Sequence, residues 1–239
     1  MRIRLKTIIT CLLIFAAVHL RAQLTNIGFT LSTEANTTQY KLSGNQFYPL
    51  YVPMGSEFMN DDWQKGYVIL ENQDRYDSLH LKLNTYKDEL IWLHSRSSSL
   101  VELDKSTIRE FGFYSETGLP MMFRKLEMNI VPKGDHYFRM LYNGKLKLVI
   151  WFKTTEEEVP AYTDKYGYMR NTNFKMRSNY FLIFPDNDFE RFRLKRMPFL
   201  YLFGEKQKEV RKLLRKNKNR LMKESDFINA VQLIDREFY

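Results

Sequence analysis

The sequence predicts an α+β protein: an antiparallel β-meander, forming a curved sheet or partly closed barrel, followed by a C-terminal pair of helices. Three observations predict this class. Apolar and polar residues alternate in several segments between residues 67 and 197, as they do in half-buried strands. Short polar turns separate these segments, which favours hairpins and therefore antiparallel neighbours. After Pro198 the apolar spacing becomes that of amphipathic helices.

The first residues have the order of a secretory signal peptide. Basic residues within the first six positions precede an apolar run, residues 7–18. This run is shorter than the roughly 20 apolar residues that a membrane-spanning helix needs. A small residue then precedes a polar one, so we expect cleavage between Ala22 and Gln23. The pattern predicts an exported protein of the periplasm or cell envelope, with no transmembrane helix after cleavage.

Cleavage changes the composition of the chain. It removes residues 1–22 and with them Cys11, which is the only cysteine. The mature chain then has no thiol for a disulfide, a nucleophile or a metal site, and its 217 residues must fold around a core alone. Lys and Arg fall from 37 to 33 against 28 Asp and Glu, so the net charge becomes +5 instead of +9.

We divide the mature chain into three parts. Residues 23–66 are polar with clustered aromatics and two prolines, and we expect them to be partly irregular. Residues 67–197 form the predicted antiparallel β domain, and residues 198–239 form a helical part packed on it. No long Pro/Gly/Ser linker separates these parts, and no fixed-period repeat is present.

The β domain is predicted from successive strand patterns. "RYDSLHLKLN" (75–84) alternates, and "ELIWLH" and "TIREFGFYS" follow it. In "YFRMLYNGKLKLVIWF" two apolar strands are joined by Asn143-Gly144, the pair that best accepts positive φ at both central positions of a type I′ turn. "NYFLIFPDNDFERFRLK" repeats the design with Pro185 to Asp188 as its turn. We expect roughly eight to ten strands.

The C-terminal part is predicted to contain two helices. The first is strongly basic and has a narrow apolar stripe; it should end near residues 217–219. Ser225 is the expected N-cap of the second helix, which has one broad apolar face. The stripe consists of Val210, Leu213, Leu214 and Leu221, and the broad face of Phe227, Ala230, Val231, Ile234 and Phe238.

These patterns together resemble those of a group of exported Bacteroidota proteins. The resemblance lies in the succession of "YDSLHLKLNTYKDEL", "HYFRMLYNGKLKLVIWFK", "NYFLIF…FERFRLK" and a basic helix followed by "ESDFINAVQLID". It covers most of residues 67–239. No activity is established for that group, so the resemblance implies an envelope location and a β-meander with C-terminal helices, but it assigns no site residue.

Motifs for catalysis or cofactor binding are missing from the sequence. The three histidines of the mature chain have no zinc-ligand spacing, and there is no nucleophile elbow or glycine-rich phosphate loop. Asp186, Asp188 and Glu190 alternate as in a calcium loop, but the glycine and the later glutamate of such a loop are missing. We interpret this segment as a hairpin turn, and we predict no catalytic residue, metal or cofactor.

The charge of the chain is concentrated in one segment. Residues 191–223 contain thirteen basic and two acidic residues, whereas the rest of the mature chain has twenty basic and twenty-six acidic residues. Export makes nucleic acid an unlikely partner, and no aromatic residue lies between Glu205 and Lys223 to stack on bases. One interpretation is a solvated helix face. The other is that the stripe packs inward and that four cations contact anionic lipid, lipopolysaccharide or an acidic partner: Lys212, Arg215, Lys216 and Arg220.

Two functions remain open at this point. The favoured one is a non-enzymatic envelope protein that binds a protein partner or an anionic surface through its basic helix. The alternative is an exported hydrolase acting on glycan or peptide, with a carboxylate site that has no local sequence signature. A pocket holding two carboxylates about 5–10 Å apart would favour the hydrolase.

Overall fold

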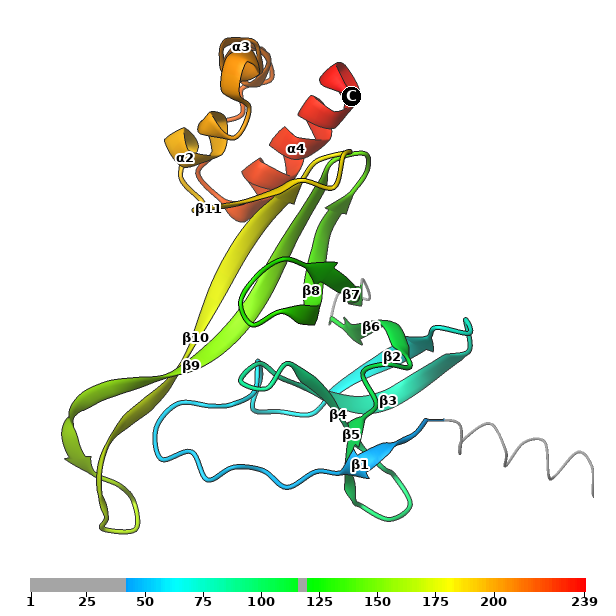
Figure 1. Cartoon of the computed structure of the whole chain (residues 1–239), viewed down its shortest axis with the longest axis vertical. Coiled ribbons are helices and arrows are strands. Elements are labelled where there is room, and N and C mark those ends of the chain that lie inside the picture. The colour runs from blue at the N-terminus through cyan, green and yellow to red at the C-terminus, as the bar shows by residue number, and fades with distance from the viewer. Residues whose placement is uncertain (1–41, 116–119) are drawn as a thin grey trace, which may run out of the picture. The chain divides into compact units, whose positions relative to one another are not determined.

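The structure is a computed structural model that describes residues 42–115 and 120–239 (Figure 1). The expected signal peptide, its cleavage site between Ala22 and Gln23, and residues 23–41 lie outside the described residues. Residues Gly44–Tyr239 form one compact unit that contains both the sheet and the helices.

Within the described ranges, the β part is a single antiparallel sheet of eleven strands, in the order β1-β5-β4-β3-β2-β6-β7-β8-β9-β10-β11. Two meanders, one running from β2 to β5 and the other from β6 to β11, are joined where β2 pairs with β6. The sheet is open, with β1 and β11 at its edges, so the predicted antiparallel meander is confirmed without closure into a barrel. The strands are β1 Gly44–Gln46, β2 Gln64–Leu70, β3 Arg75–Asn84, β4 Glu89–Leu93, β5 Leu100–Leu103, β6 Ile108–Tyr114, β7 Pro120–Met128, β8 Gly134–Asn143, β9 Lys147–Thr163, β10 Met169–Ile183 and β11 Phe189–Phe192.

The strand predicted over residues 75–84 is β3, with the same bounds. Its buried side chains do not follow a strict period of two, because Tyr76 and Leu81 are an odd number of positions apart. A register shift against β2 accounts for this, since Ser78 has a φ of 57° at the irregular position. Such a β-bulge adds one residue and brings the apolar side chains back to one face.

The sheet is curled, because strands far apart in its order contact each other. The Thr154 amide of β9 donates to the Thr85 carbonyl in the β3–β4 turn over 3.0 Å, and the two hydroxyls lie 2.7 Å apart. Buried rings fill the interior of the sheet part: Phe111 stacks on Phe123 with centroids 4.9 Å apart, and Tyr137 meets Phe111 edge-on at 4.9 Å. Burial of such large apolar surfaces is the main favourable term in folding.

Four helical segments cover the end of the sheet that contains the β8–β9 turn (Figure 1). They are α2 Arg196–Tyr201, the 3₁₀ turn η2 Gly204–Lys206, α3 Gln207–Lys216 and α4 Glu224–Phe238. No helix within the described ranges has the length and apolar character needed to cross a bilayer. The helices share one core cluster with the sheet, built from Leu146, Leu148, Leu182, Phe192, Phe199, Leu200, Phe203, Val210, Leu214, Leu221, Phe227, Ala230, Val231 and Ile234. The predicted stripe and the predicted broad face therefore both point inward.

The start of α4 differs from the prediction. Ser225 is exposed and is not the N-cap, because the helix begins at Glu224 and its N-cap is Lys223, two residues before the predicted one. The Asp226 carboxylate accepts the amides of Met222 at 2.8 Å and Lys223 at 3.2 Å. An anionic acceptor in the first turn also interacts favourably with the helix dipole, which a serine hydroxyl does more weakly.

The β8–β9 turn also differs from the prediction. Asn143 pairs with Lys147, so the loop consists of residues 144–146, and neither Asn143 nor Gly144 has a left-handed φ. The Asp235 carboxylate of α4 accepts the amides of Lys145 at 3.2 Å and Leu146 at 2.7 Å. The prediction of a two-residue type I′ turn was therefore wrong. The hydrogen bonds to Asp235, a residue of the distant helix α4, set the shape of the loop instead.

The second predicted turn is confirmed. Residues 184–188 join β10 and β11, and the Phe184 amide donates to the Asp188 carbonyl over 2.8 Å. Asn187 has a φ of 67°, a conformation that asparagine tolerates better than most residues.

Candidate functional site

The basic face of the helical part is the first candidate, because the structure divides α3 into two sides. Val210 and Leu214 are buried, and Leu213 is half-buried. The four cations singled out in the sequence are all exposed: Lys212, Arg215 and Lys216 lie on α3, whereas Arg220 lies in the segment after the end of α3 at Lys216 and not on the predicted helix. We call these four residues the basic face. Packing of the apolar side fixes which side chains reach solvent.

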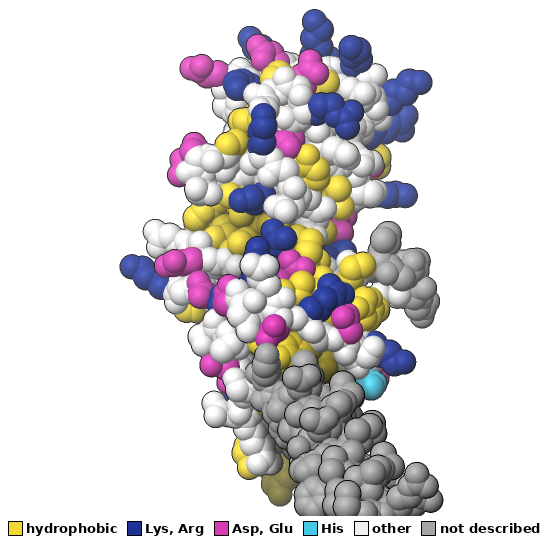
Figure 2. Space-filling view, turned by 90° about the vertical axis from the view of Figure 1, so that its right-hand side faces the viewer, with side chains coloured by type: hydrophobic (Ala, Val, Ile, Leu, Met, Phe, Trp, Pro, Cys, Tyr) yellow, Lys and Arg dark blue, Asp and Glu magenta, His cyan; other side chains and the backbone are white. Residues whose placement is uncertain are grey.

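No carboxylate of the described residues pairs with a cation of the basic face. Among residues 42–115 and 120–239, no ion pair includes any of its four side chains. Figure 2 shows Lys and Arg side chains projecting from the helical end at the top of the molecule. Unpaired cations gathered in this way create a positive potential that attracts anions.

Apolar side chains are exposed on the same helical part. Met197 and Tyr201 belong to α2, and Met222 follows α3; their exposed fractions are 40%, 65% and 75%. The Arg211 guanidinium contacts the Met197 sulfur at 3.8 Å. Large apolar side chains mixed with cations are typical of surfaces that bind at a membrane interface.

A groove of about 720 Å³ lies between the sheet edge and α2. It is lined by Ser178, Tyr180, Arg191, Phe192, Arg193, Leu194 and Pro198. Tyr180 donates to the Glu224 carboxylate over 2.8 Å, and burial together with this acceptor raises the pKa of Tyr180 to about 12. The phenol therefore stays protonated at neutral pH, and the groove offers guanidinium groups and aromatic surface to a ligand.

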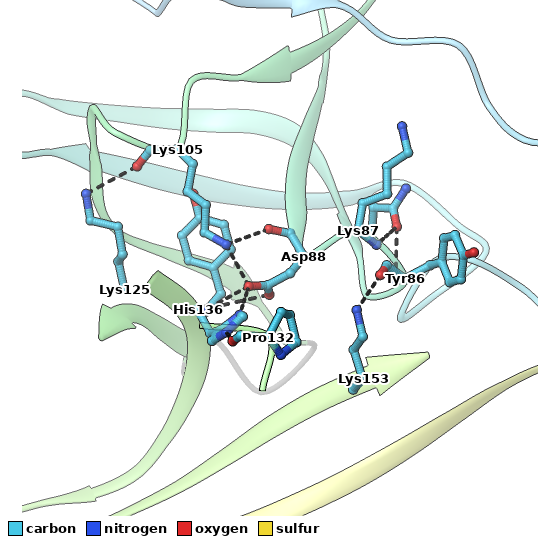
Figure 3. Close-up of polar contacts among 10 residues, drawn as sticks. Tyr86, Lys87, Asp88, Lys105, Lys125, Pro132, His136 and Lys153 are labelled. Atoms are coloured by element: carbon cyan, nitrogen blue, oxygen red, sulfur yellow. Dashed lines mark hydrogen bonds and ion pairs between the residues drawn. The ribbon is translucent and has the colours of Figure 1, made fainter. Parts of the chain in front are cut away.

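A buried charged cluster connects distant strands (Figure 3). Asp88 lies in the β3–β4 turn with a φ of 64°. Its carboxylate accepts the Lys105 ammonium at 2.6 Å and lies 2.9 Å from Nδ1 of His136 on β8. Nε2 of His136 is 2.7 Å from the Pro132 carbonyl oxygen. In the order of the sheet, four strands separate β4 from β8, so this Asp88 cluster holds the curled sheet together.

The contacts of the Asp88 cluster argue against catalysis by it. Both ring nitrogens of His136 face acceptors, a carboxylate and a carbonyl, so neither is available to take a proton from a substrate. The Asp88 carboxylate also receives the Tyr137 amide at 3.3 Å. Burial, followed by the charge of Asp88, raises the pKa of Tyr137 well above its usual value. The cluster is built to stabilise the fold.

Two further carboxylates bear on the hydrolase alternative, the buried Glu57 and the half-buried Glu89. Glu57 accepts the Asn84 side-chain amide at 2.8 Å and the Leu50 amide at 3.1 Å, which attaches the loop before β2 to the end of β3. Burial and the neighbouring Glu102 raise the pKa of Glu89 to about 6. Glu89 and Glu102 line neither the groove beside α2 nor the smaller groove between residues 217–219 and α4.

The sequence predicted the basic face but not the Asp88 cluster or the groove. His136 has no metal-ligand spacing in the sequence, and Asp88 and Lys105 have no local signature. No cluster of three metal-ligating side chains occurs in the described ranges. Comparisons with protein-family models, with curated proteins and with solved structures gave no match to this chain.

Proposed function

We propose that this chain is an exported, non-enzymatic protein of the cell envelope that binds an anionic lipid surface through its basic face. The observation that carries the proposal is the exposure of Lys212, Arg215, Lys216 and Arg220 without a carboxylate partner in the described residues. They are presented on a helical part that is held in place by the shared core. The export pattern at the N-terminus and the resemblance to exported Bacteroidota proteins support the location.

The expected affinity follows from the number of cations. A Lys or Arg near a negatively charged membrane contributes about 1 kcal/mol, so the basic face contributes about 4 kcal/mol before entropy losses. Met197, Tyr201 and Met222 can add apolar contact if they reach the interface. Binding should therefore be reversible, and it should weaken as salt screens the charges.

Co-sedimentation with vesicles tests the proposal. The mature protein is mixed with phosphatidylglycerol vesicles and with phosphatidylcholine vesicles over a salt series. We expect binding to the anionic vesicles only, decreasing from low salt to physiological salt. Arg215→Glu/Lys216→Glu should abolish it.

A matched control separates the basic face from net charge. Lys65 on β2 and Lys133 before β8 are exposed, and neither takes part in an ion pair within the described chain. Lys65→Glu/Lys133→Glu changes the net charge equally and should retain most of the binding. Equal losses in both double variants, or no binding at low salt, would reject the basic face as the contact surface. N-terminal sequencing of protein recovered from the envelope tests export, with Gln23 as the expected first residue.

A further inference from the structure

One stretch of the sheet edge has no neighbouring strand. The edge strand β11 pairs only with Tyr180–Ile183 of β10. Farther along β10, Phe174 forms an isolated bridge with Gly55. Between these two points, residues 175–179 have no pairing on the side away from β9 in the part of the chain that the structure describes. We call this stretch the open edge.

The backbone groups of the open edge point outward. The Phe174 amide donates to the Met54 carbonyl over 3.0 Å, so it points away from β9. The pairing of β10 with β9 continues without a shift from Thr172 to Ile183. Because backbone direction alternates along a strand, Met176 and Ser178 also direct their N–H and C=O groups away from β9. Two donors and two acceptors are thus arranged as a template for another strand.

Charged side chains often protect such edges from pairing, but the charged side chains of the open edge form ion pairs with the neighbouring strand β9. Both Lys175 and Arg177 form ion pairs with Glu157 on the neighbouring β9, the former at 3.7 Å. The side chain of Met176 is 40% exposed and adds apolar surface. An unprotected edge of this kind can pair with an added strand.

The open edge leads into the groove beside α2. Ser178 and Tyr180 line the groove from β10, and Arg191 and Arg193 line it from the end of β11 and beyond. Both arginines are exposed, and neither has a carboxylate partner within the described residues. Guanidinium groups bind carboxylates with paired hydrogen bonds, so the groove favours acidic side chains.

We propose that the open edge and the groove bind an extended peptide segment of a partner protein, a segment that carries acidic side chains. The peptide adds a short strand beside Met176 and Ser178, and its backbone supplies the complementary hydrogen bonds. A carboxylate at the groove end of the peptide meets Arg191 and Arg193. This site shares no residue with the basic face, so it does not depend on the proposed lipid binding.

Fluorescence anisotropy of the full mature chain with labelled synthetic peptides tests the proposal. The probe is an octapeptide of alternating Val and Glu, compared with a Val-Lys octapeptide and with a Val-Glu octapeptide whose backbone amides are methylated on alternate residues. We expect the unmethylated Val-Glu peptide to bind at least about tenfold more tightly than either comparison peptide, the equivalent of one charge-assisted contact. Hydrogen exchange of the outward amides of Met176 and Ser178 should slow when the peptide binds.

Variants of the chain locate the site. Arg191→Gln/Arg193→Gln should weaken binding about tenfold, whereas Lys195→Gln/Arg196→Gln, which changes two exposed cations outside the groove lining, should not. Ser178→Pro removes an outward amide and should abolish binding, while Ser178→Ala should preserve it. Circular dichroism verifies the fold of the proline variant, and the arginine pair and the methylated peptide keep the test valid if that variant misfolds.

Three outcomes would overturn the proposal. The first is equal binding of the methylated and unmethylated peptides, and the second is equal binding to both arginine double variants. The third is that no peptide binds. This outcome includes the case in which the chain forms an oligomer with itself and the Ser178→Pro variant is monomeric. In that case the open edge serves a second copy of this chain instead of a partner peptide.

Discussion

Replacing Gly144 by alanine should destabilise the protein through Asp235 rather than through backbone strain. A Cβ atom at this position would lie 2.2 Å from Oδ2 of Asp235 and 2.6 Å from the Tyr142 hydroxyl oxygen. Both distances are far shorter than ordinary contact, so the carboxylate must move. Since the φ of Gly144 is not left-handed, alanine brings no conformational penalty of that kind.

The magnitude follows from the contacts of Asp235. Its carboxylate accepts the Lys145 and Leu146 amides and, at 2.8 Å, the Tyr142 hydroxyl. A hydrogen bond to a charged group contributes about 1.5–3 kcal/mol, less where water can replace it. The Lys145 amide is exposed, so water replaces its hydrogen bond easily. We therefore expect Gly144→Ala to lower the free energy of unfolding by about 2 kcal/mol.

A double-mutant cycle in urea is the assay. Gly144→Ala should cost about 2 kcal/mol in the native chain and about 1 kcal/mol less when Asp235→Ala is already present, because the clash with the carboxylate has then been removed and only the contact with Tyr142 remains. Gly167→Ala is the matched control. Gly167 has a φ of 85° and no atom near its Cβ position, so its cost should be the same with and without Asp235. An unchanged cost of Gly144→Ala in the two backgrounds would refute the contact explanation.

Two further predictions concern buried charges. Asp88→Ala should lower the free energy of unfolding by about 3 kcal/mol in urea denaturation, because it leaves Lys105 and His136 without their carboxylate; Asp62→Ala, at an exposed position before β2, is the comparison, and equal effects would contradict the prediction. Glu89→Gln tests the raised pKa. The folded protein holds a proton on Glu89 up to about pH 6, whereas the unfolded chain releases it near 4.5, so stability falls as pH rises through this window. The glutamine variant should therefore gain about 1 kcal/mol at pH 7, allowing for partial exposure, and nothing at pH 4. A pH profile identical to that of the native chain would exclude this explanation.

Much of the fold was predictable because its signals are local. Alternating apolar residues predicted β3. The proline, aspartates and asparagine of residues 185–188 predicted the turn between β10 and β11. The β8–β9 turn was not predictable, since its shape depends on Asp235, ninety positions after Lys145. The pairing of β2 with β6 was not predictable either, because nothing in either strand specifies a neighbour from another meander.

The same distinction applies to the candidate sites. The basic face could be predicted because helical periodicity and charge are both properties of a short segment. The Asp88 cluster assembles three residues from a turn, a loop and a strand, and only the curl of the sheet brings them together. The open edge depends on where β11 ends relative to β10, which is a matter of register and not of composition.

The basic face should lower the stability of the helix that carries it. Lys212 has Lys208 four residues before it and Lys216 four residues after it, and all three are exposed. Like charges at this spacing destabilise a helix by about 0.2–0.5 kcal/mol per pair, whereas opposite charges stabilise it by a similar amount. Lys212→Glu replaces two repulsive pairs with two attractive ones.

This variant separates stability from binding. We expect Lys212→Glu to raise the free energy of unfolding by about 0.8–2 kcal/mol and to weaken binding to phosphatidylglycerol vesicles, because it removes one of four contacts and adds a repelled charge. Lys65→Glu, made on β2, should change neither quantity by a comparable amount. If Lys212→Glu stabilises the helix and leaves vesicle binding intact, the cations serve solubility alone, and the lipid-binding role must be abandoned.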